Sequence, residues 1–198
     1  MKNVVFDIGG VLVDWQPHLG YLDVFATEAE ALAFLDRTDF KGKNLRGDQG
    51  ERFADLAQEL DDPADRELFA SYVSRFARMV VGEVPGTWDV LEDLRAKGVP
   101  LHAITNWSAE TWPEGHKAHP RLATVFGVTV VSGHEKVLKP DPRIFALLCE
   151  RAGVAAADCI FIDDSPTNVD GAKAFGMDAI HFTGADALRV ALVDRGVL

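Results

Sequence analysis

The sequence has no long hydrophobic run, since nowhere in its 198 residues do about eighteen apolar side chains follow one another. A helix needs roughly 20 mostly apolar residues to cross a bilayer, so we expect no membrane-spanning segment and no membrane partner. The first ten residues, MKNVVFDIGG, also lack the apolar core and cleavage site of a secretory signal peptide. The expected localisation is therefore cytoplasmic.

Cysteine is equally scarce. Cys149 and Cys159 are the only two cysteines, and they do not form a C-x-x-C pair. Each lies in an apolar stretch, so we interpret both as small buried hydrophobic residues rather than as a redox pair.

Positive charge is also limited, with 20 Lys and Arg against 31 Asp and Glu, a net charge of −11. This balance argues against a nucleic-acid partner, because affinity for a polyanion comes mainly from clustered Lys and Arg. It does not exclude a small phosphorylated substrate. A bound divalent cation and one or two basic side chains can invert the local field in an acidic protein.

What the chain does contain is typical of a globular enzyme, with 47% hydrophobic and 26% charged residues. Residues 4–6 form a short β-rich run that ends at Asp7, and Gly9-Gly10 indicates a turn. From about residue 16 to 84, apolar side chains recur every three or four positions. We interpret this region as three or four amphipathic helices, with a loop over residues 44–48 and no strand.

After Pro85-Gly86 the pattern alternates between helix and strand. The predicted strands cover residues 100–105, 128–132, 159–162 and 179–182, and helices separate most of them. Alternation of this kind predicts an α/β fold, a doubly wound, Rossmann-like parallel sheet. We therefore expect a core made of residues 1–14 and 86–198, with residues 15–85 inserted as a helical cap.

Polar side chains follow the predicted strands, at the edge where ligands of such sheets bind. They are one threonine, one asparagine, one lysine and three carboxylates: Thr105, Asn106, Lys139, Asp7, Asp163 and Asp164. Three carboxylates cannot share one rim at neutral pH without a compensating cation. Mg²⁺ suits them, because it prefers oxygen ligands and commonly contacts a substrate phosphate as well.

Four segments in this order resemble the motifs of the haloacid dehalogenase superfamily. FDIGGVL is similar to its first motif, ITN to its second, the lysine of LKPDPRIF to its third, and FIDDSPTNVDGAKAFG to its fourth. The resemblance covers the whole chain, and the helical block corresponds to the family's helical cap. It implies a magnesium-dependent hydrolase, in particular a phosphatase of small phosphorylated metabolites.

The resemblance also implies a role for each site residue. Asp7 would attack phosphorus and form an aspartyl-phosphate that water then hydrolyses. Thr105 and Asn106 would hydrogen-bond the phosphoryl oxygens, and Lys139 would balance the charge on Asp7 and the phosphate. The magnesium ligands would be the following: Asp7, the carbonyl of Gly9, Asp164, and Asp163 directly or through water.

One position departs from the family pattern. The superfamily's phosphatases usually carry a second Asp two residues after the nucleophile, and this Asp protonates the leaving alcohol. Here the position is Gly9, which has no side chain. General acid catalysis by that residue, usually worth about 10²–10⁴-fold, is therefore unavailable.

Three interpretations of this departure stay open. The chain is a phosphatase for an undemanding leaving group, such as a sugar 1-phosphate, and its first motif resembles a bacterial branch that includes sugar-1-phosphate phosphatases. Alternatively it is a 2-haloacid dehalogenase, although those enzymes need no metal and lack the acidic pair retained at Asp163-Asp164. The third alternative is a non-catalytic binding protein.

Two further residues are candidates for substrate binding: Arg46 in the cap and Trp107 after the second motif. Nothing in the chain marks an oligomeric interface.

Overall fold

The computed structural model describes residues 2–198, and its centre is a five-stranded sheet with the order β5-β4-β1-β6-β7. Every neighbouring pair in this sheet is parallel, which confirms the predicted doubly wound α/β class. The strands are β1 (Asn3–Phe6), β4 (Leu101–Thr105), β5 (Val128–Val131), β6 (Cys159–Asp163) and β7 (Asp178–His181).

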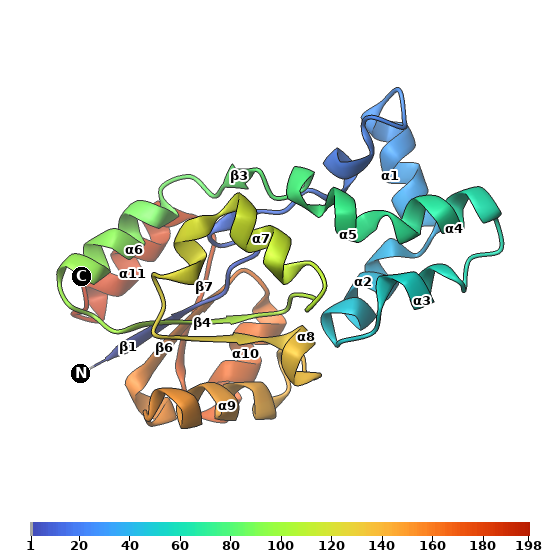
Figure 1. The fold of residues 1–198 in the computed structure, drawn as a ribbon. Coiled ribbons are helices and arrows are strands. Elements are labelled where there is room, and N and C mark those ends of the chain that lie inside the picture. The colour runs from blue at the N-terminus through green and yellow to red at the C-terminus, as the bar shows by residue number, and fades with distance from the viewer. Residues whose placement is uncertain (1) are drawn as a thin grey trace.

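Helices cover both faces of the sheet, as Figure 1 shows. On one face lie α6 (Thr87–Ala96), α7 (Trp112–Ala118) and α11 (Ala185–Asp194), and on the other lie α9 (Pro142–Ala152) and α10 (Pro166–Phe175). Because successive strand residues point to opposite faces, β1 contributes to two hydrophobic clusters. Val4 and Phe6 belong to one cluster and Val5 to the other, and all three are fully buried.

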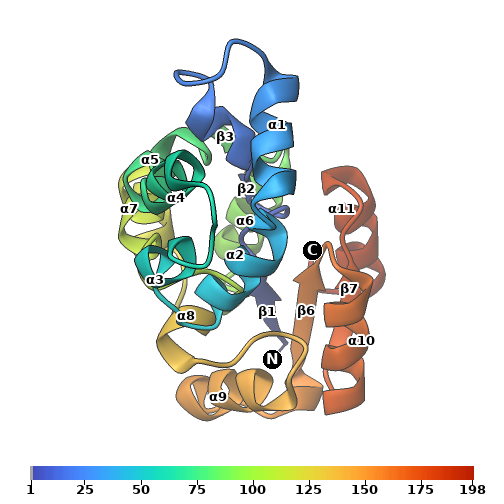
Figure 2. The same ribbon diagram turned by 90° about the vertical axis from the view of Figure 1, so that its right-hand side faces the viewer.

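The chain leaves the sheet after β1 and returns before α6 through two short paired strands. β2 (Val13–Asp14) and β3 (Gly82–Glu83) run antiparallel, with Val13 opposite Glu83. The helical block lies between them in the sequence and beside the sheet in space (Figures 1 and 2). Its helices are α1 (Glu28–Arg37), α2 (Phe40–Asp48), α3 (Phe53–Ala57), α4 (Pro63–Ala70) and α5 (Tyr72–Arg75), and 3₁₀ turns flank them at Pro17–Tyr21 and Phe76–Arg78.

Aromatic side chains form the interior of this block. Tyr72 lies at its centre, with its ring centroid 4.4 Å from that of Phe53 and 5.1 Å from that of Phe40. The aromatic contacts continue into the sheet domain, because Phe76 packs against Trp107 at 5.3 Å between centroids. Aromatic pairs at these separations bury large areas, so the block is packed against the rest of the molecule.

Two secondary-structure predictions are wrong. Residues 44–48 are the second half of helix α2, not a loop. The Asp39 side chain caps this helix by accepting a hydrogen bond from the Gly42 amide, and Gly47 lets the Phe53 ring approach closer than a Cβ would allow. Packing therefore outweighs the weak helix propensity of Gly and Asp here. The short strand β3 was also not predicted, since two residues show no alternation.

No helix in the part of the chain that the structure describes is long and apolar enough to span a membrane.

Candidate active site

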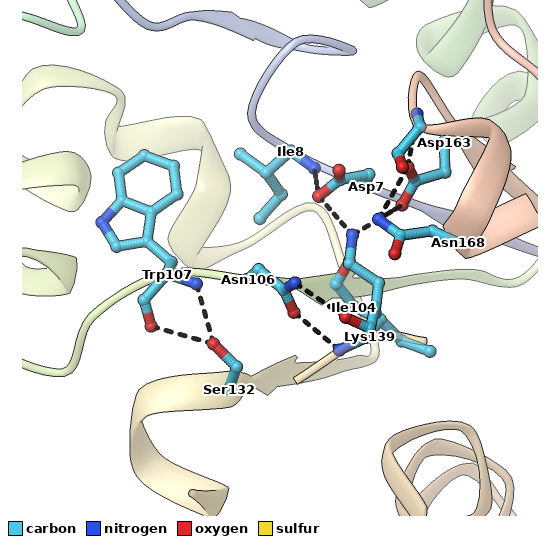
Figure 3. A network of polar contacts seen from close by, with 10 residues as sticks. Asp7, Ile8, Ile104, Asn106, Trp107, Ser132, Lys139, Asp163 and Asn168 are labelled. Atoms are coloured by element: carbon cyan, nitrogen blue, oxygen red, sulfur yellow. Dashed lines mark hydrogen bonds and ion pairs between the residues drawn. The ribbon is translucent and has the colours of Figure 1, made fainter. Parts of the chain in front are cut away.

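The predicted site residues meet at one edge of the sheet, beyond the carboxyl ends of the three central strands. Asp7 directly follows β1, Thr105 ends β4 and Asp163 ends β6. Lys139 reaches them from the loop between α8 (Ser132–Glu135) and α9. Figure 3 shows Asp7, Lys139 and Asp163 pointing toward one another.

Lys139 is the centre of the charge network. Its side chain is 1% exposed, and its Nζ lies 2.9 Å from Asp7 Oδ1 and 2.7 Å from Asp163 Oδ2. The Nζ also donates to the carbonyl of Ile104 at 3.1 Å. Burial alone would lower the pKa of Lys139, but the two carboxylates raise that pKa above its ordinary value. The ammonium is therefore charged.

Asp163 is held by more donors than Lys139 alone. Its Oδ1 accepts from the Ser165 amide at 2.8 Å and from Asn168 Nδ2 at 3.1 Å. Its Oδ2 accepts from Lys139 and lies 3.2 Å from the same Asn168 nitrogen. A carboxylate has about four acceptor sites, and these contacts use them. Asp163 thus fixes the position of Lys139.

The three predicted carboxylates form one cluster. One oxygen each of Asp7, Asp163 and Asp164 lies within 4.8 Å of the others. Burial, opposed by Lys139 and reinforced by the neighbouring carboxylates, raises the pKa of Asp7, and burial with Asp163 raises that of Asp164. A single ammonium therefore does not balance three acidic groups, and the set has the oxygen ligands that a hard cation prefers.

Thr105 and Asn106 differ in the hydrogen bonds that their side chains make. Thr105 Oγ1 is buried and has no hydrogen-bond partner among the residues that the structure describes. An unpaired buried hydroxyl is costly, so this oxygen is available to a ligand. The Asn106 amide instead bonds the Lys139 backbone: Oδ1 accepts from its N–H at 2.8 Å, and Nδ2 donates to its carbonyl at 3.2 Å. Asn106 therefore anchors the loop that carries Lys139 (Figure 3).

The two glycines after Asp7 are not equivalent. Gly10 has φ +75°, and a Cβ built on it would lie 2.5 Å from Asp164 Oδ2. A Cβ on Gly9 would have nothing within 4 Å. The chain therefore needs glycine at position 10, both for its left-handed backbone and for the approach of Asp164, whereas position 9 has room for a side chain.

We expect Gly10→Ala to remove activity as well as stability. The left-handed backbone should cost about 1–2 kcal/mol of unfolding free energy, and the new methyl should push Asp164 out of the cluster. Gly98→Ala is the matched control, because Gly98 has φ +73° and open space around its Cβ position. Both variants should lose similar stability in urea unfolding, but only Gly10→Ala should lose kcat. Equal kcat in the two variants would contradict this reading of Gly10.

A cavity of about 60 Å³ opens between the helical block and the sheet edge. Its lining is largely aromatic, with a few polar groups: Gly9, Trp15, Asn44, Asp48, Tyr72, Phe76, Asn106, Trp107 and Thr111. Trp107, a predicted substrate-binding residue, is thus at the cavity. Arg46 is not among the lining residues, and its guanidinium is hydrogen-bonded to Glu51 and Glu59. A substrate contact by Arg46 remains a prediction.

Sequence reasoning missed several residues at this site. Asn168 lies in the first turn of α10, and its position in the fourth motif was the available signal. Asn44 and Asp48 were assigned to a loop, so nothing indicated that they face the cavity. Ser132 also had no signal: its Oγ accepts from the Trp107 amide at 2.9 Å and donates to the Asp48 carbonyl at 2.5 Å.

Comparison with known proteins agrees with this geometry. A family model described as a hydrolase, haloacid dehalogenase-like, matches residues 1–176. Flavin mononucleotide hydrolase 1 of Arabidopsis thaliana is 35% identical over 112 residues, which are 57% of this chain and 45% of that protein. The phosphorylated carbohydrates phosphatase of Thermotoga maritima is 27% identical over 91% of this chain and 84% of its own length.

A solved structure has the same fold. A haloacid dehalogenase family enzyme of Bacteroides thetaiotaomicron, in complex with magnesium and inorganic phosphate, has a TM-score of 0.69 and 23% sequence identity. The similarity covers 93% of this chain and 95% of that chain.

Proposed function

The chain belongs to the haloacid dehalogenase-like hydrolases as a phosphatase of small phosphorylated substrates, and we propose that it acts through an aspartyl-phosphate on Asp7 with the aid of Mg²⁺. The observation that carries this proposal is the position of Asp7. Its carboxylate is buried at the end of β1, 2.9 Å from the Lys139 ammonium and within the three-carboxylate cluster.

The residues present fit a magnesium ion. Asp7 and Asp164 would hold it together with the carbonyl of Gly9, and Asp163 would take part through water, since its oxygens already accept four contacts from protein donors. When bound, the ion supplies the positive charge that lets one anion approach another and stabilises charge on the phosphoryl oxygens.

The chain's own groups perform the remaining tasks. Asp7 attacks phosphorus while Lys139 neutralises part of the charge, and the free hydroxyl of Thr105 donates to a phosphoryl oxygen. Asn106 keeps Lys139 in place and has one amide hydrogen left for the phosphate. The proposed boundaries remain a core of residues 1–14 and 86–198 and a cap of residues 15–85.

A sugar phosphate is the substrate class that we propose. Aromatic rings suit the apolar faces of a sugar, and the amide of Asn44 and the hydroxyl of Thr111 suit its hydroxyl groups. The carbohydrate phosphatase of Thermotoga maritima supports this choice. A sugar 1-phosphate is the preferred member, because its anomeric oxygen is a better leaving group than an ordinary alcohol.

The test is a panel of sugar 1-phosphates, sugar 6-phosphates and a 2-haloacid, assayed with and without magnesium for the wild type and Asp7→Asn. We expect phosphate release only with magnesium and only from the wild type, fastest with a 1-phosphate. Halide release without metal would favour the dehalogenase alternative, and no turnover of any compound would favour a binding protein.

Magnesium should also stabilise the fold. At a concentration of about 100 times Kd, a ligand that binds only the native state adds about 2.7 kcal/mol, so Tm should rise by about 5–10 °C for a chain of this length. Asp164→Asn should abolish most of this rise, whereas Asp170→Asn, an exposed carboxylate on α10, should keep it. A scanning calorimetry series in magnesium and in EDTA measures the shift. An equal rise in Tm in both variants would show that Asp164 is not a magnesium ligand.

A further inference from the structure

The proposed reaction lacks one component, a group that gives a proton to the departing alcohol oxygen. Gly9 has no side chain, yet the space beside it is open, since a Cβ built there would meet nothing within 4 Å. Gly9 also lines the cavity between the helical block and the sheet edge. A proton donor facing this cavity from another element would therefore occupy the right region.

Only two of the cavity-lining residues, all of which the structure describes, are titratable: Asp48 and Tyr72. Burial, with the nearby Asp48 as a further cause, raises the pKa of the Tyr72 hydroxyl well above its ordinary value. That hydroxyl also donates to Asn44 Oδ1 at 3.1 Å. Tyr72 is thus a poor acid–base group near neutral pH, and Asp48 is the remaining candidate.

Asp48 is held firmly on both its backbone and its side chain. Its Oδ2 accepts from Asn44 Nδ2 at 2.9 Å, and its carboxylate accepts from the backbone amide of Ser108. The amide of Asn44 cannot turn away, because Tyr72 bonds its oxygen. The Asp48 carbonyl accepts from Ser132 Oγ at the start of α8. These bonds fix the last residue of α2 against the sheet domain.

The charged and titratable groups that face Asp48 are Lys139 of the sheet domain and Tyr72 of α5. Burial raises the pKa of Asp48, and the bonds from Ser108 and Asn44 and the charge of Lys139 lower it by less, so the resulting pKa is about 7. A carboxyl group that titrates near neutral pH can give a proton and take one back in the same cycle.

We propose that Asp48 is the general acid–base of this enzyme and does from the cap what a side chain at position 9 would otherwise do. The inference rests on the proposed function. In the first step an Asp7 oxygen bonds to phosphorus, and the bond from phosphorus to the alcohol oxygen breaks. The electron pair stays on that oxygen, which takes the proton of the Asp48 carboxyl and leaves as the alcohol.

The second step returns both carboxyl groups to their starting states. Asp48, now a carboxylate, takes a proton from a water molecule while the water oxygen bonds to phosphorus. The bond between phosphorus and the Asp7 oxygen breaks, and its electron pair returns to the Asp7 carboxylate. Inorganic phosphate leaves, and Asp48 is again protonated.

The decisive experiment compares two leaving groups in Asp48→Asn. We expect kcat for an alkyl phosphate to fall about 10²–10⁴-fold, because its alkoxide cannot leave without a proton. With p-nitrophenyl phosphate the first step needs no acid and the second step lacks its base. The variant should therefore release one equivalent of p-nitrophenol per enzyme in a burst, followed by slow turnover. Asp61→Asn, an exposed carboxylate of the helical block, is the control and should behave like the wild type.

Adding a carboxyl group at position 9 provides a rescue. Gly9→Asp in the Asp48→Asn background places an acid in open space, and we expect it to raise the alkyl phosphate rate at least tenfold over Asp48→Asn alone. Rates of Asp48→Asn within threefold of the wild type for both substrates would overturn the proposal. So would an equal loss for both substrates without a burst, since that result indicates a structural role.

The wild type gives a second measurement that does not depend on how the variants fold. In single turnovers, the transfer rate for an alkyl phosphate should fall as pH rises above about 7, because the acid form of Asp48 is lost. The rate for p-nitrophenyl phosphate should lack this limb, and identical profiles would overturn the proposal. Activity retained by Asp7→Asn would instead overturn the proposed function, so the two failures are distinguishable.

Discussion

Asp7→Asn is expected to lower kcat on every phosphomonoester by about 10⁴-fold or more while the protein stays folded, because an amide cannot serve as the nucleophile. The amide matches the carboxylate in shape, so it still accepts the bond that the Ile8 amide gives to Asp7 Oδ1 at 2.6 Å. The loss should therefore be chemical rather than structural, and circular dichroism should show the wild-type fold.

Trapping the intermediate tests the same assignment directly. Wild-type enzyme quenched in acid during turnover should carry one labile phosphoryl group, which hydroxylamine releases as it does from acyl phosphates. Asp7→Asn should carry none. Asp186→Asn, an exposed carboxylate in the first turn of α11, is the control and should be labelled like the wild type. Labelling of Asp7→Asn would place the nucleophile elsewhere.

Lys139→Met is expected to cost about 3–5 kcal/mol of unfolding free energy, because removing one partner of a buried charge network leaves the others uncompensated. Asp7 and Asp163 are both buried and share this one ammonium. Phosphatase activity should be lost as well, since among the described residues Lys139 is the one cationic side chain that pairs with Asp7.

The loss of unfolding free energy in Lys139→Met should increase as pH rises. Burial and the neighbouring carboxylates already raise the pKa of Asp7, and the loss of Lys139 raises it further. A carboxyl group whose pKa is higher in the folded state than in the unfolded state lowers the free energy of unfolding as pH rises above the pKa of the unfolded state. Urea unfolding in EDTA should therefore show a larger deficit at pH 8 than at pH 5. Lys41→Met, an exposed lysine on α2, should show none, and a deficit below about 1 kcal/mol at both pH values would contradict the network.

The absence of a side chain at Gly9 bears directly on which substrates the site can hydrolyse. Without a proton donor, the chain would be confined to leaving groups as good as an anomeric oxygen. If the carboxyl group of Asp48 on α2 is the proton donor, that restriction is removed, and we expect the site to hydrolyse sugar 6-phosphates and other alkyl phosphates as well. Substrate choice then depends on the aromatic and polar lining of the cavity.

Two hydrogen bonds join the helical block to the sheet domain. The Asp48 carbonyl bonds Ser132, and the Glu110 carboxylate accepts from the Phe53 amide at 2.7 Å. If Asp48 is the acid, these contacts do more than hold two parts together, because they align the acid with Asp7. Movement at the paired strands β2 and β3 would then separate the acid from the nucleophile.

The sequence by itself determined the sheet and the residues at its edge. Strands that alternate with helices predict a parallel sheet, and in such a sheet Asp7, Thr105 and Asp163, which end or follow strands, lie at the same edge. The structure adds that their strands are neighbours. The order of residues along the chain carries that information, because each of these groups directly follows or ends a strand that its own segment predicts.

Only the tertiary structure decided which other side chains face them. Residues 44–48 were predicted to be a loop, yet packing around Phe53 makes them helical and turns Asn44 and Asp48 toward the cavity. Asp48 and Ser132 are 84 positions apart, and a contact over that separation leaves no periodic trace in the sequence. The alternation of strands and helices follows from local pattern, whereas the order of the strands and the placement of the helical block depend on contacts between distant residues that no local pattern encodes.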